Sequence, residues 1–212
     1  MPAVAAAALS PTRLQHLKAQ PRQPGEASFF WYEGAFKSEA VKVLPGEYFV
    51  MNEEILIMTT LGSCIAACLW DRTARVGGLN HFMLPEGNDG SGRYGSFAME
   101  VLINHMMKLG ARRTRMEAKV FGGGAVIGGM GSSKVGERNT EFVLDYLHTE
   151  RIPVVSKDVL DIYPRKVCFM PVSGKAMVKR LASANTQALL AQDRAAAQRA
   201  APAPSSGSVD LF

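Results

Sequence analysis

The sequence predicts a mixed α/β protein of the α+β class, with mostly antiparallel strands and two main helices packed on them. Short apolar runs separated by polar turns, over residues 47–85 and again over 165–181, are typical of β-hairpins. Two other segments, residues 94–109 and 139–148, carry apolar side chains at helical spacing. A chain of 212 residues can bury one sizeable core, so we expect one domain with tails.

The first segment of the chain, residues 1–27, is rich in Ala, Pro, Gln and Arg. This composition predicts a flexible leader before a folded domain at residues 28–182. Four consecutive aromatic residues at 29–32 are interpreted either as packing on the domain surface or as a docking patch. Packing is favoured because large aromatic side chains are rarely left exposed. Strands are expected at 47–51 and 55–60.

The clearest hairpin surrounds the polar residues 71–75. If Asp71 to Ala74 close the turn, Cys64 faces His81 directly across the strand pair, although a longer loop would shift this register. Directly opposed residues share a face, with Cβ atoms about 4.5–5.5 Å apart. A thiol and an imidazole at that range can act as a nucleophile and its base.

Two interpretations of Cys64 stay open on these residues alone. A cysteine in a strand is most often a core residue, and this interpretation is adopted for Cys68 and Cys168. Cys64 differs because Gly62 and Ser63 precede it. The glycine permits a tight turn, and the backbone amides just before and at Cys64 can then bind an oxyanion.

The second half of the chain is expected to alternate helices and strands. The helix at 94–109 should stop at Gly110, with His105 in its last turn, where a positive charge suits the helix dipole. Asn139 is expected to cap the second helix, which runs to His148. The remaining predicted elements are strands at 116–121 and 154–156 and a hairpin of 165–170 with 176–181.

A glycine-rich run at residues 121–131 suggests nucleotide binding at first sight. However, it lacks the third glycine of a dinucleotide-binding fingerprint and the Gly-Lys-Ser/Thr of a P-loop. We interpret it as a loop that allows close backbone approach near the active site and admits a protein substrate. Its flexible part is expected at residues 128–134.

Composition and residue spacing argue against several classes of function. The formal net charge of +5 favours acidic partners, but no aromatic platform is interleaved with the basic residues, so nucleic-acid binding is not expected. Three cysteines without a Cys-x-x-Cys pair suggest reduced thiols in the cytoplasm. No run reaches the roughly 18 apolar residues of a membrane helix, and no metal-ligand spacing occurs. Residues 183–212 read as an Ala- and Gln-rich stretch able to form a helix, followed by a disordered tail.

Several blocks together resemble the CheD family, the chemoreceptor glutamine deamidases of bacterial chemotaxis. The resemblance covers residues 40–182, except that 158–164 departs from the Gly-Gly turn common in the family. Its most specific part is Gly-Ser-Cys at 62–64 with His-Phe-Met-Leu-Pro at 81–85. The other similar blocks are Asp71, Gly77-Gly78, Arg93-Tyr94-Gly95, Ala98-Met99-Glu100, the run 118–123, Gly136-Glu137-Arg138-Asn139 and Arg165-Lys166-Val167.

The resemblance implies an α/β sandwich with a cysteine-protease-like deamidase architecture. It carries the family's catalytic cysteine and histidine to Cys64 and His81. The family's third residue, a threonine, corresponds to Thr59, with Thr60 as the neighbour to exclude. The implied reaction converts glutamine side chains of methyl-accepting chemotaxis receptors to glutamate and releases ammonia, without a cofactor or a metal. Backbone amides at Gly62 and Ser63 would support the oxyanion.

The implied partners are the acidic cytoplasmic coiled coil of a receptor and a CheC-type phosphatase, with the protein in the cytoplasm and recruited to receptor arrays. Two alternatives stay open. The protein can act chiefly as a binding regulator of the receptor or the phosphatase, with catalysis secondary. It can also be a cysteine hydrolase of another amide, since a Cys–His pair alone does not define the substrate.

Overall fold

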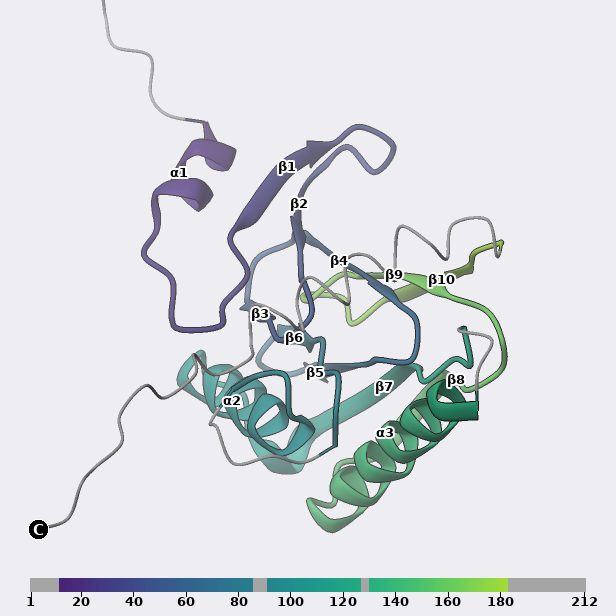
Figure 1. Ribbon diagram of the computed structural model, residues 1–212. Helices are drawn as coiled ribbons and strands as arrows, with labels where there is room; N and C mark the ends of the chain where they lie inside the picture. The colour runs from purple at the N-terminus through teal and green to yellow at the C-terminus, as the bar shows by residue number, and fades with distance from the viewer. Residues whose placement is uncertain (1–11, 86–90, 127–129, 183–212) are drawn as a thin grey trace, which may run out of the picture.

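The computed structural model describes residues 12–85, 91–126 and 130–182, which fold into two five-stranded sheets and helices (Figure 1). One sheet, called here the outer sheet, has the order β1-β2-β4-β9-β10, and the helix-covered sheet has the order β3-β6-β5-β7-β8. The strands of the outer sheet are β1 Phe29–Glu33, β2 Ser38–Lys42, β4 Leu56–Leu61, β9 Arg165–Phe169 and β10 Ala176–Arg180. Those of the helix-covered sheet are β3 Tyr48–Met51, β6 Val76–Asn80, β5 Ile65–Asp71, β7 Met116–Gly122 and β8 Val154–Val159.

The strand pairing confirms the prediction of a mostly antiparallel mixed α/β fold. Only β2 with β4 and β7 with β8 are parallel among the described pairs. The helix α3, Met130–Thr149, connects β7 to β8, as the crossover of a parallel pair requires. The predicted hairpin of residues 165–170 with 176–181 is also confirmed, as β9 and β10.

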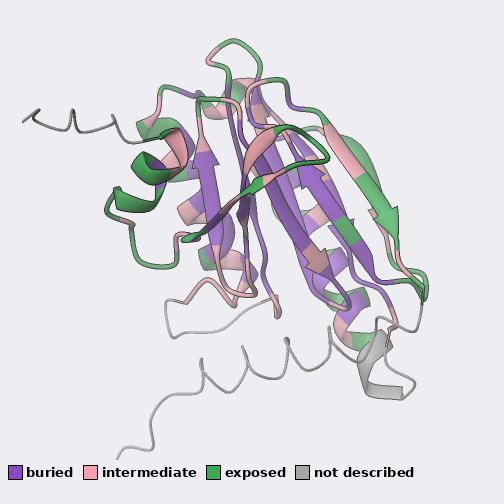
Figure 2. Cartoon of the chain, turned by 90° about the horizontal axis from the view of Figure 1, so that it is seen from above, coloured by how far each residue is buried: buried purple, intermediate pink, exposed green. Residues whose placement is uncertain are grey.

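The two main helices cover one face of the helix-covered sheet, and the outer sheet packs on its other face. The helix α2, Gly95–Lys108, lies with α3 on the same side of this sheet (Figure 1), and buried residues fill the layers between (Figure 2). Strand β5 shows how the side chains divide between the layers. Ile65, Ala67 and Leu69 pack toward the helices, whereas Cys64, Ala66 and Cys68 pack toward the outer sheet.

The N-terminal part of the described chain includes a short helix within the segment expected to be a leader. This helix, α1 at Arg13–Ala19, begins with a capping box made by Thr12 and Gln15, and its Leu17 is buried in the inter-sheet core. The aromatic run forms β1, where Phe30 is buried while Phe29 and Tyr32 are 60% and 57% exposed. The predicted packing therefore holds for only part of that run.

The second main helix differs from its prediction. Helix α3 begins at Met130, so the prediction that Asn139 caps it is wrong, and residues 130–134 are helical rather than a flexible loop. The glycines in this stretch concealed the helix. Gly136 is needed for packing, because a Cβ atom there would lie 2.3 Å from the Gly123 carbonyl oxygen.

A short 3-10 helix, Arg113–Arg115, precedes β7. None of the described helices is long and apolar enough to cross a membrane.

Candidate active site

The three side chains predicted to form the site lie where strands of both sheets end or begin. Cys64 directly precedes β5, and His81 directly follows β6, both in the helix-covered sheet. Thr59 lies in β4 of the outer sheet. All three are buried, with 2%, 1% and 1% of their surface exposed, and the Thr59 and His81 side chains contact each other between the two sheets.

The predicted register of the β5–β6 hairpin is wrong by two residues. Asp71 pairs with Val76 and Ile65 with Phe82, so the same register places Ala66, not Cys64, opposite His81. A shift of two residues keeps Cys64 on the same face as His81, as a diagonal neighbour. Diagonal neighbours lie about 7–8 Å apart, within reach of a long or aromatic side chain.

The register differs because the turn is longer than predicted. The Asp71 carboxylate accepts hydrogen bonds from the backbone amides of Thr73 and Ala74, at 2.9 and 3.0 Å, which stabilises a four-residue loop. Arg75 ends this loop with a φ of 54°, in the left-handed region. The side-chain acceptor at Asp71 therefore sets the loop length, and the loop length sets the register.

The two strands separate close to His81. The Asn80 side-chain oxygen, and not a backbone carbonyl, accepts the hydrogen bond of the Ala67 amide at 3.0 Å. The His81 backbone pairs instead with residues before β3, accepting from the Gly46 amide at 2.7 Å and donating to the Glu47 carbonyl at 2.9 Å. His81 therefore sits at a local break in the ladder, where its backbone is held from a second side.

The Thr59 hydroxyl group determines which nitrogen of His81 carries the proton. It lies 2.8 Å from His81 Nδ1 and 2.8 Å from the Val43 carbonyl oxygen. A carbonyl oxygen only accepts, so the single hydroxyl hydrogen goes to Val43 and Thr59 Oγ1 must accept from Nδ1. His81 therefore carries its hydrogen on Nδ1 and a lone pair on Nε2. Thr60, the neighbour to exclude, is only half-buried and points to the opposite face of β4.

His81 is held in its neutral form. Burial lowers the pKa of His81 to about 4, with a contribution in the same direction from Lys42, although a hydrogen bond to the Val43 carbonyl opposes it. Its Nε2 atom is buried and has no hydrogen-bond partner among the described residues. A buried nitrogen with an unused lone pair is suited to accept a proton.

The segment before Cys64 is held through three consecutive carbonyl groups. The Gly62 carbonyl accepts from the Gly124 amide at 2.9 Å, and the Cys64 carbonyl accepts from the Gly123 amide at 2.8 Å. A Cβ atom at Gly122 would lie 2.1 Å from the Cys64 carbonyl oxygen, so only glycine fits there. The predicted close backbone approach of the glycine-rich run is therefore confirmed; its residues 127–129 lie outside the described part.

The third carbonyl, that of Ser63, is bound by a residue that the sequence analysis assigned to a helix cap. The buried Asn139 side chain donates through Nδ2 to the Ser63 carbonyl at 3.2 Å and to the Met83 carbonyl at 2.8 Å. The only sequence signal for this role was its position in the Gly-Glu-Arg-Asn block at 136–139.

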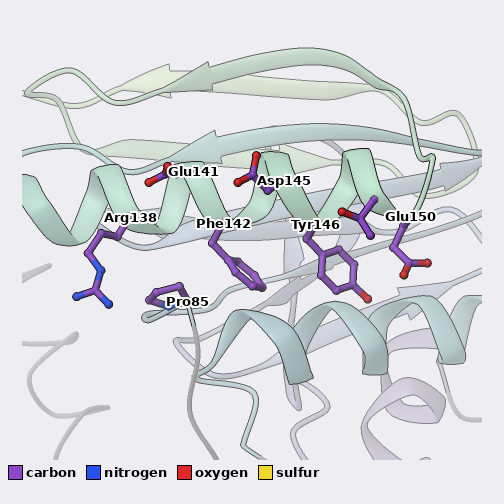
Figure 3. Close-up of a pocket in the computed structure, with 8 residues that line it drawn as sticks. Pro85, Arg138, Glu141, Phe142, Asp145, Tyr146 and Glu150 are labelled. Atoms are coloured by element: carbon purple, nitrogen blue, oxygen red, sulfur yellow. The ribbon is translucent and has the colours of Figure 1, made fainter.

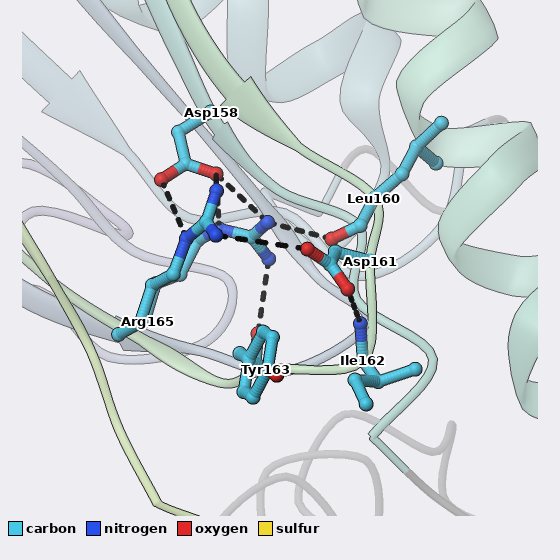
Figure 4. A network of polar contacts seen from close by, with 7 residues as sticks. Asp158, Leu160, Asp161, Ile162, Tyr163 and Arg165 are labelled. Atoms are coloured by element: carbon cyan, nitrogen blue, oxygen red, sulfur yellow. Dashed lines mark hydrogen bonds and ion pairs between the residues drawn. The ribbon is translucent and has the colours of Figure 1, made fainter.

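The segment 158–164 is bound by Arg165 (Figure 4), and it forms hydrogen bonds with the glycine-rich run. Arg165 is fully buried, pairs with Asp158 at 2.9 Å and donates to the Leu160 and Tyr163 carbonyls at 2.6 and 3.0 Å. Leu160 in turn donates to the Gly122 carbonyl at 2.8 Å. Burial alone would raise the pKa of Asp158, but Arg180 and Arg165 together lower it.

The structure also describes two further cysteines and a pocket along α3. All three cysteines are buried without a disulfide bond, and burial raises the pKa of Cys68 and Cys168 above the usual value for a thiol. A pocket of about 480 Å³ lies along α3 beside Pro85, with Glu141, Asp145 and Glu150 among its lining residues (Figure 3). It contains none of Thr59, Cys64 and His81. The described residues include no cluster of three or more potential metal ligands.

A mixed α/β protein with a thiol, an imidazole and a hydroxyl group buried between its sheets has the layout of a thiol-dependent hydrolase. Comparison with known proteins gives the family. A family model described as CheD chemotactic sensory transduction matches residues 83–180. A protein of Albidiferax ferrireducens, named probable chemoreceptor glutamine deamidase CheD 1, is 63% identical over 95% of this chain and 87% of its own. This chain belongs to the CheD family.

Two further relatives carry the same name. The protein from Dechloromonas aromatica is 54% identical over 86% of this chain and 93% of its own, and that from Shewanella oneidensis is 49% identical over 86% and 92%. Among solved structures, the Bacillus licheniformis hypothetical protein YfiH has a TM-score of 0.34 at 9% identity over 54% of this chain and 49% of its own. That similarity is too low to support any conclusion.

Proposed function

We propose that this protein hydrolyses glutamine side chains of chemoreceptors to glutamate, with Cys64 as the nucleophile. The substrate assignment follows from the family, whose relatives are named for chemoreceptor glutamine deamidation. The chemical assignment depends mainly on one observation, the unpartnered Nε2 of a neutral His81 on the same face as Cys64.

In the first half of the reaction, His81 Nε2 accepts the Cys64 thiol proton as the sulfur attacks the carboxamide carbon. A carbon–sulfur bond forms, and the carbonyl oxygen gains the negative charge that backbone amides near Gly62, Ser63 and Cys64 stabilise. His81 then returns its proton to the nitrogen as the carbon–nitrogen bond breaks. Ammonia leaves, and a thioester remains on Cys64.

In the second half, water attacks the thioester with His81 as the base, which releases glutamate and restores the thiol. Thr59 orients the imidazole throughout by accepting from Nδ1, the role of the third member in a triad. The low pKa of His81 suits this cycle, because the histidine is neutral when the substrate arrives. No step requires a metal or a cofactor.

We also propose which surface of the receptor this protein binds and a second protein partner. The net charge of +5 favours an acidic surface, which fits the cytoplasmic coiled coil of a receptor. The protein would then act in the cytoplasm at receptor arrays, where a CheC-type phosphatase is a second partner.

Mass spectrometry of a receptor cytoplasmic fragment tests this proposal. The fragment is incubated with the wild-type protein and with Cys64→Ser, and glutamine-to-glutamate conversion is mapped by peptide analysis. We expect conversion with the wild type only. Conversion by both proteins would contradict the role of Cys64. Binding without any conversion would contradict the deamidase and favour the binding-regulator function.

A further inference from the structure

The β5–β6 hairpin opens like a fork just beyond its last backbone pair. Ile65 and Phe82 exchange both backbone hydrogen bonds, at 3.1 and 3.0 Å. Beyond this pair the strands diverge, because the Met83 and Leu84 amides both donate to the Arg93 carbonyl, at 2.9 and 3.0 Å. Cys64 lies on one arm, directly beyond this pair, and faces Met83 on the other arm, whereas His81 lies on the turn side of the pair, next to Phe82.

Asn139 closes this fork. Its Nδ2 atom donates to the Ser63 carbonyl on the first arm and to the Met83 carbonyl on the second. Carbonyl oxygens only accept, so the amide must present its nitrogen to both arms, and both of its hydrogens are used. The side chain therefore links the two strands where the Met83 and Leu84 amides donate to Arg93 instead of to the strand that carries Cys64.

The position of Asn139 is itself held firmly. One turn earlier on α3, Gly136 packs against Gly123 so closely that a Cβ atom would lie 2.3 Å from the Gly123 carbonyl oxygen. Gly123 donates in turn to the Cys64 carbonyl at 2.8 Å. The helix thus holds the Ser63 carbonyl directly, the Cys64 carbonyl through Gly123, and the strand that follows His81 at Met83.

Asn139 is an uncommon choice for a buried helix position. Asparagine has a low helix propensity, and its Oδ1 atom is buried without a hydrogen-bond partner among the described residues. These costs are borne at a position where an apolar residue would leave the Ser63 and Met83 carbonyls without this donor. A buried polar group with an unsatisfied atom calls for an explanation other than packing.

We infer that Asn139 is a positioning residue, which fixes the separation of Cys64 and His81 by bridging the Ser63 and Met83 carbonyls. This inference rests on the proposed function of the two residues. It assigns to α3 a role in aligning nucleophile and base, although Asn139 itself transfers no proton and forms no bond to substrate.

Two variants and one control test the inference. Asn139→Leu removes both donors while keeping the branching of the side chain, and Asn139→Ser keeps one donor on a side chain too short to span the fork. Leu147→Ala is the matched control, because Leu147 is a fully buried residue two turns further along α3 that packs in the helix-side core. It should lower thermal stability while leaving the fork intact.

The first readout is the rate of Cys64 alkylation by iodoacetamide at neutral pH, located by peptide mass spectrometry. It needs no receptor, so it remains informative if the deamidase proposal fails. In the wild type, the neutral His81 should assist removal of the thiol proton as the sulfur attacks, so alkylation should be faster than in His81→Gln. Both Asn139 variants should slow alkylation toward the His81→Gln rate, and Leu147→Ala should not.

The second readout is the kinetics of receptor-fragment deamidation. We expect kcat to fall about 10-fold to 100-fold in Asn139→Leu, less in Asn139→Ser, with KM unchanged in both. A folded Asn139→Leu or Asn139→Ser protein with the wild-type kcat and alkylation rate would overturn the inference while the proposed function stands. Equal losses in Leu147→Ala, measured below its melting transition, would also overturn it.

Discussion

The two ends of the β5–β6 hairpin differ in whether their buried polar groups have hydrogen-bond partners. At the turn end, the fully buried Asp71 carboxylate accepts from the Thr73, Ala74 and Arg112 amides and from the Arg115 guanidinium, at 2.8–3.2 Å. At the open end, His81 Nε2 and Asn139 Oδ1 are buried with no partner among the described residues.

The difference separates a polar group with a structural role from the one to which we assign catalytic proton transfer. Burial alone would raise the pKa of Asp71, but Arg115 and the Arg112 and Ala74 amides together hold it below its usual value. The carboxylate is thus charged, fully bonded and inert. The His81 imidazole has one nitrogen bonded and one lone pair unused, an arrangement that costs stability and leaves a base available.

The largest expected effect comes from removing the satisfied group. Asp71→Ala should lower the free energy of unfolding by about 3–5 kcal/mol, because it leaves buried amides without an acceptor and Arg115 without its partner. Urea denaturation measures this loss. Asp71→Asn is the matched control and should lose less, since its oxygen can still accept from the turn amides.

Asp71→Ala should leave catalysis by the folded protein unchanged. The deamidation rate per folded molecule should equal that of the wild type, because Asp71 lies at the far end of β5 from Cys64. A stable Asp71→Ala protein with a reduced rate would mean that the two ends are not independent.

The second effect follows from the depressed pKa of His81. The unfolded chain protonates this histidine near pH 6.5, whereas the folded protein holds it neutral down to about pH 4. The unfolded state therefore binds more protons between these values, and the free energy of unfolding falls as pH decreases through this window. The contribution of His81 is about 3 kcal/mol, fully present above pH 6.5 and lost by about pH 4.

Denaturant titrations at several pH values test this effect, with His81→Gln as the control. The variant retains every other titrating group, including His105, whose pKa burial also lowers. The wild type should lose more stability on acidification than the variant. Parallel pH dependences for the two proteins would show that His81 is not held neutral by the fold.

The elements with strong local patterns were predictable from the sequence, and the contacts between distant elements were not. The hairpins and α2 were visible because their apolar spacing follows one period throughout. The start of α3 was hidden because Gly131 and Gly136 look like loop residues until the close approach of Gly136 to Gly123 is known.

In the candidate site, too, the contacts between distant elements could not be predicted from the sequence. Cys64 and His81 stand out through a motif, but the Thr59–His81 contact joins two sheets and no local spacing encodes it. The register error had a side-chain cause, since the Asp71 carboxylate lengthens the turn. Asn139 was misassigned because a cap and a bridge between carbonyls use the same amide, and only the packing of α3 distinguishes them.

The smallest expected effect concerns the hydroxyl group that orients His81. Thr59→Val keeps the shape of the side chain but removes the acceptor for Nδ1, so the imidazole can exchange its tautomer and turn. We expect kcat to fall about 10-fold to 100-fold, or about 1–3 kcal/mol, with KM for the receptor fragment unchanged. Thr59→Ser should retain most of the activity because it keeps the hydroxyl group.

Thr60→Val provides the matched control for this last change. Thr60 is the next residue in β4 and lies half-buried on the opposite face. The substitution Thr60→Val makes the same exchange of a hydroxyl group for a methyl group, but away from His81. A loss of kcat in Thr59→Val that Thr60→Val does not share would assign the effect to the Thr59–His81 hydrogen bond. Equal kcat values for Thr59→Val and the wild type would mean that the Glu47 and Gly46 backbone contacts alone orient His81.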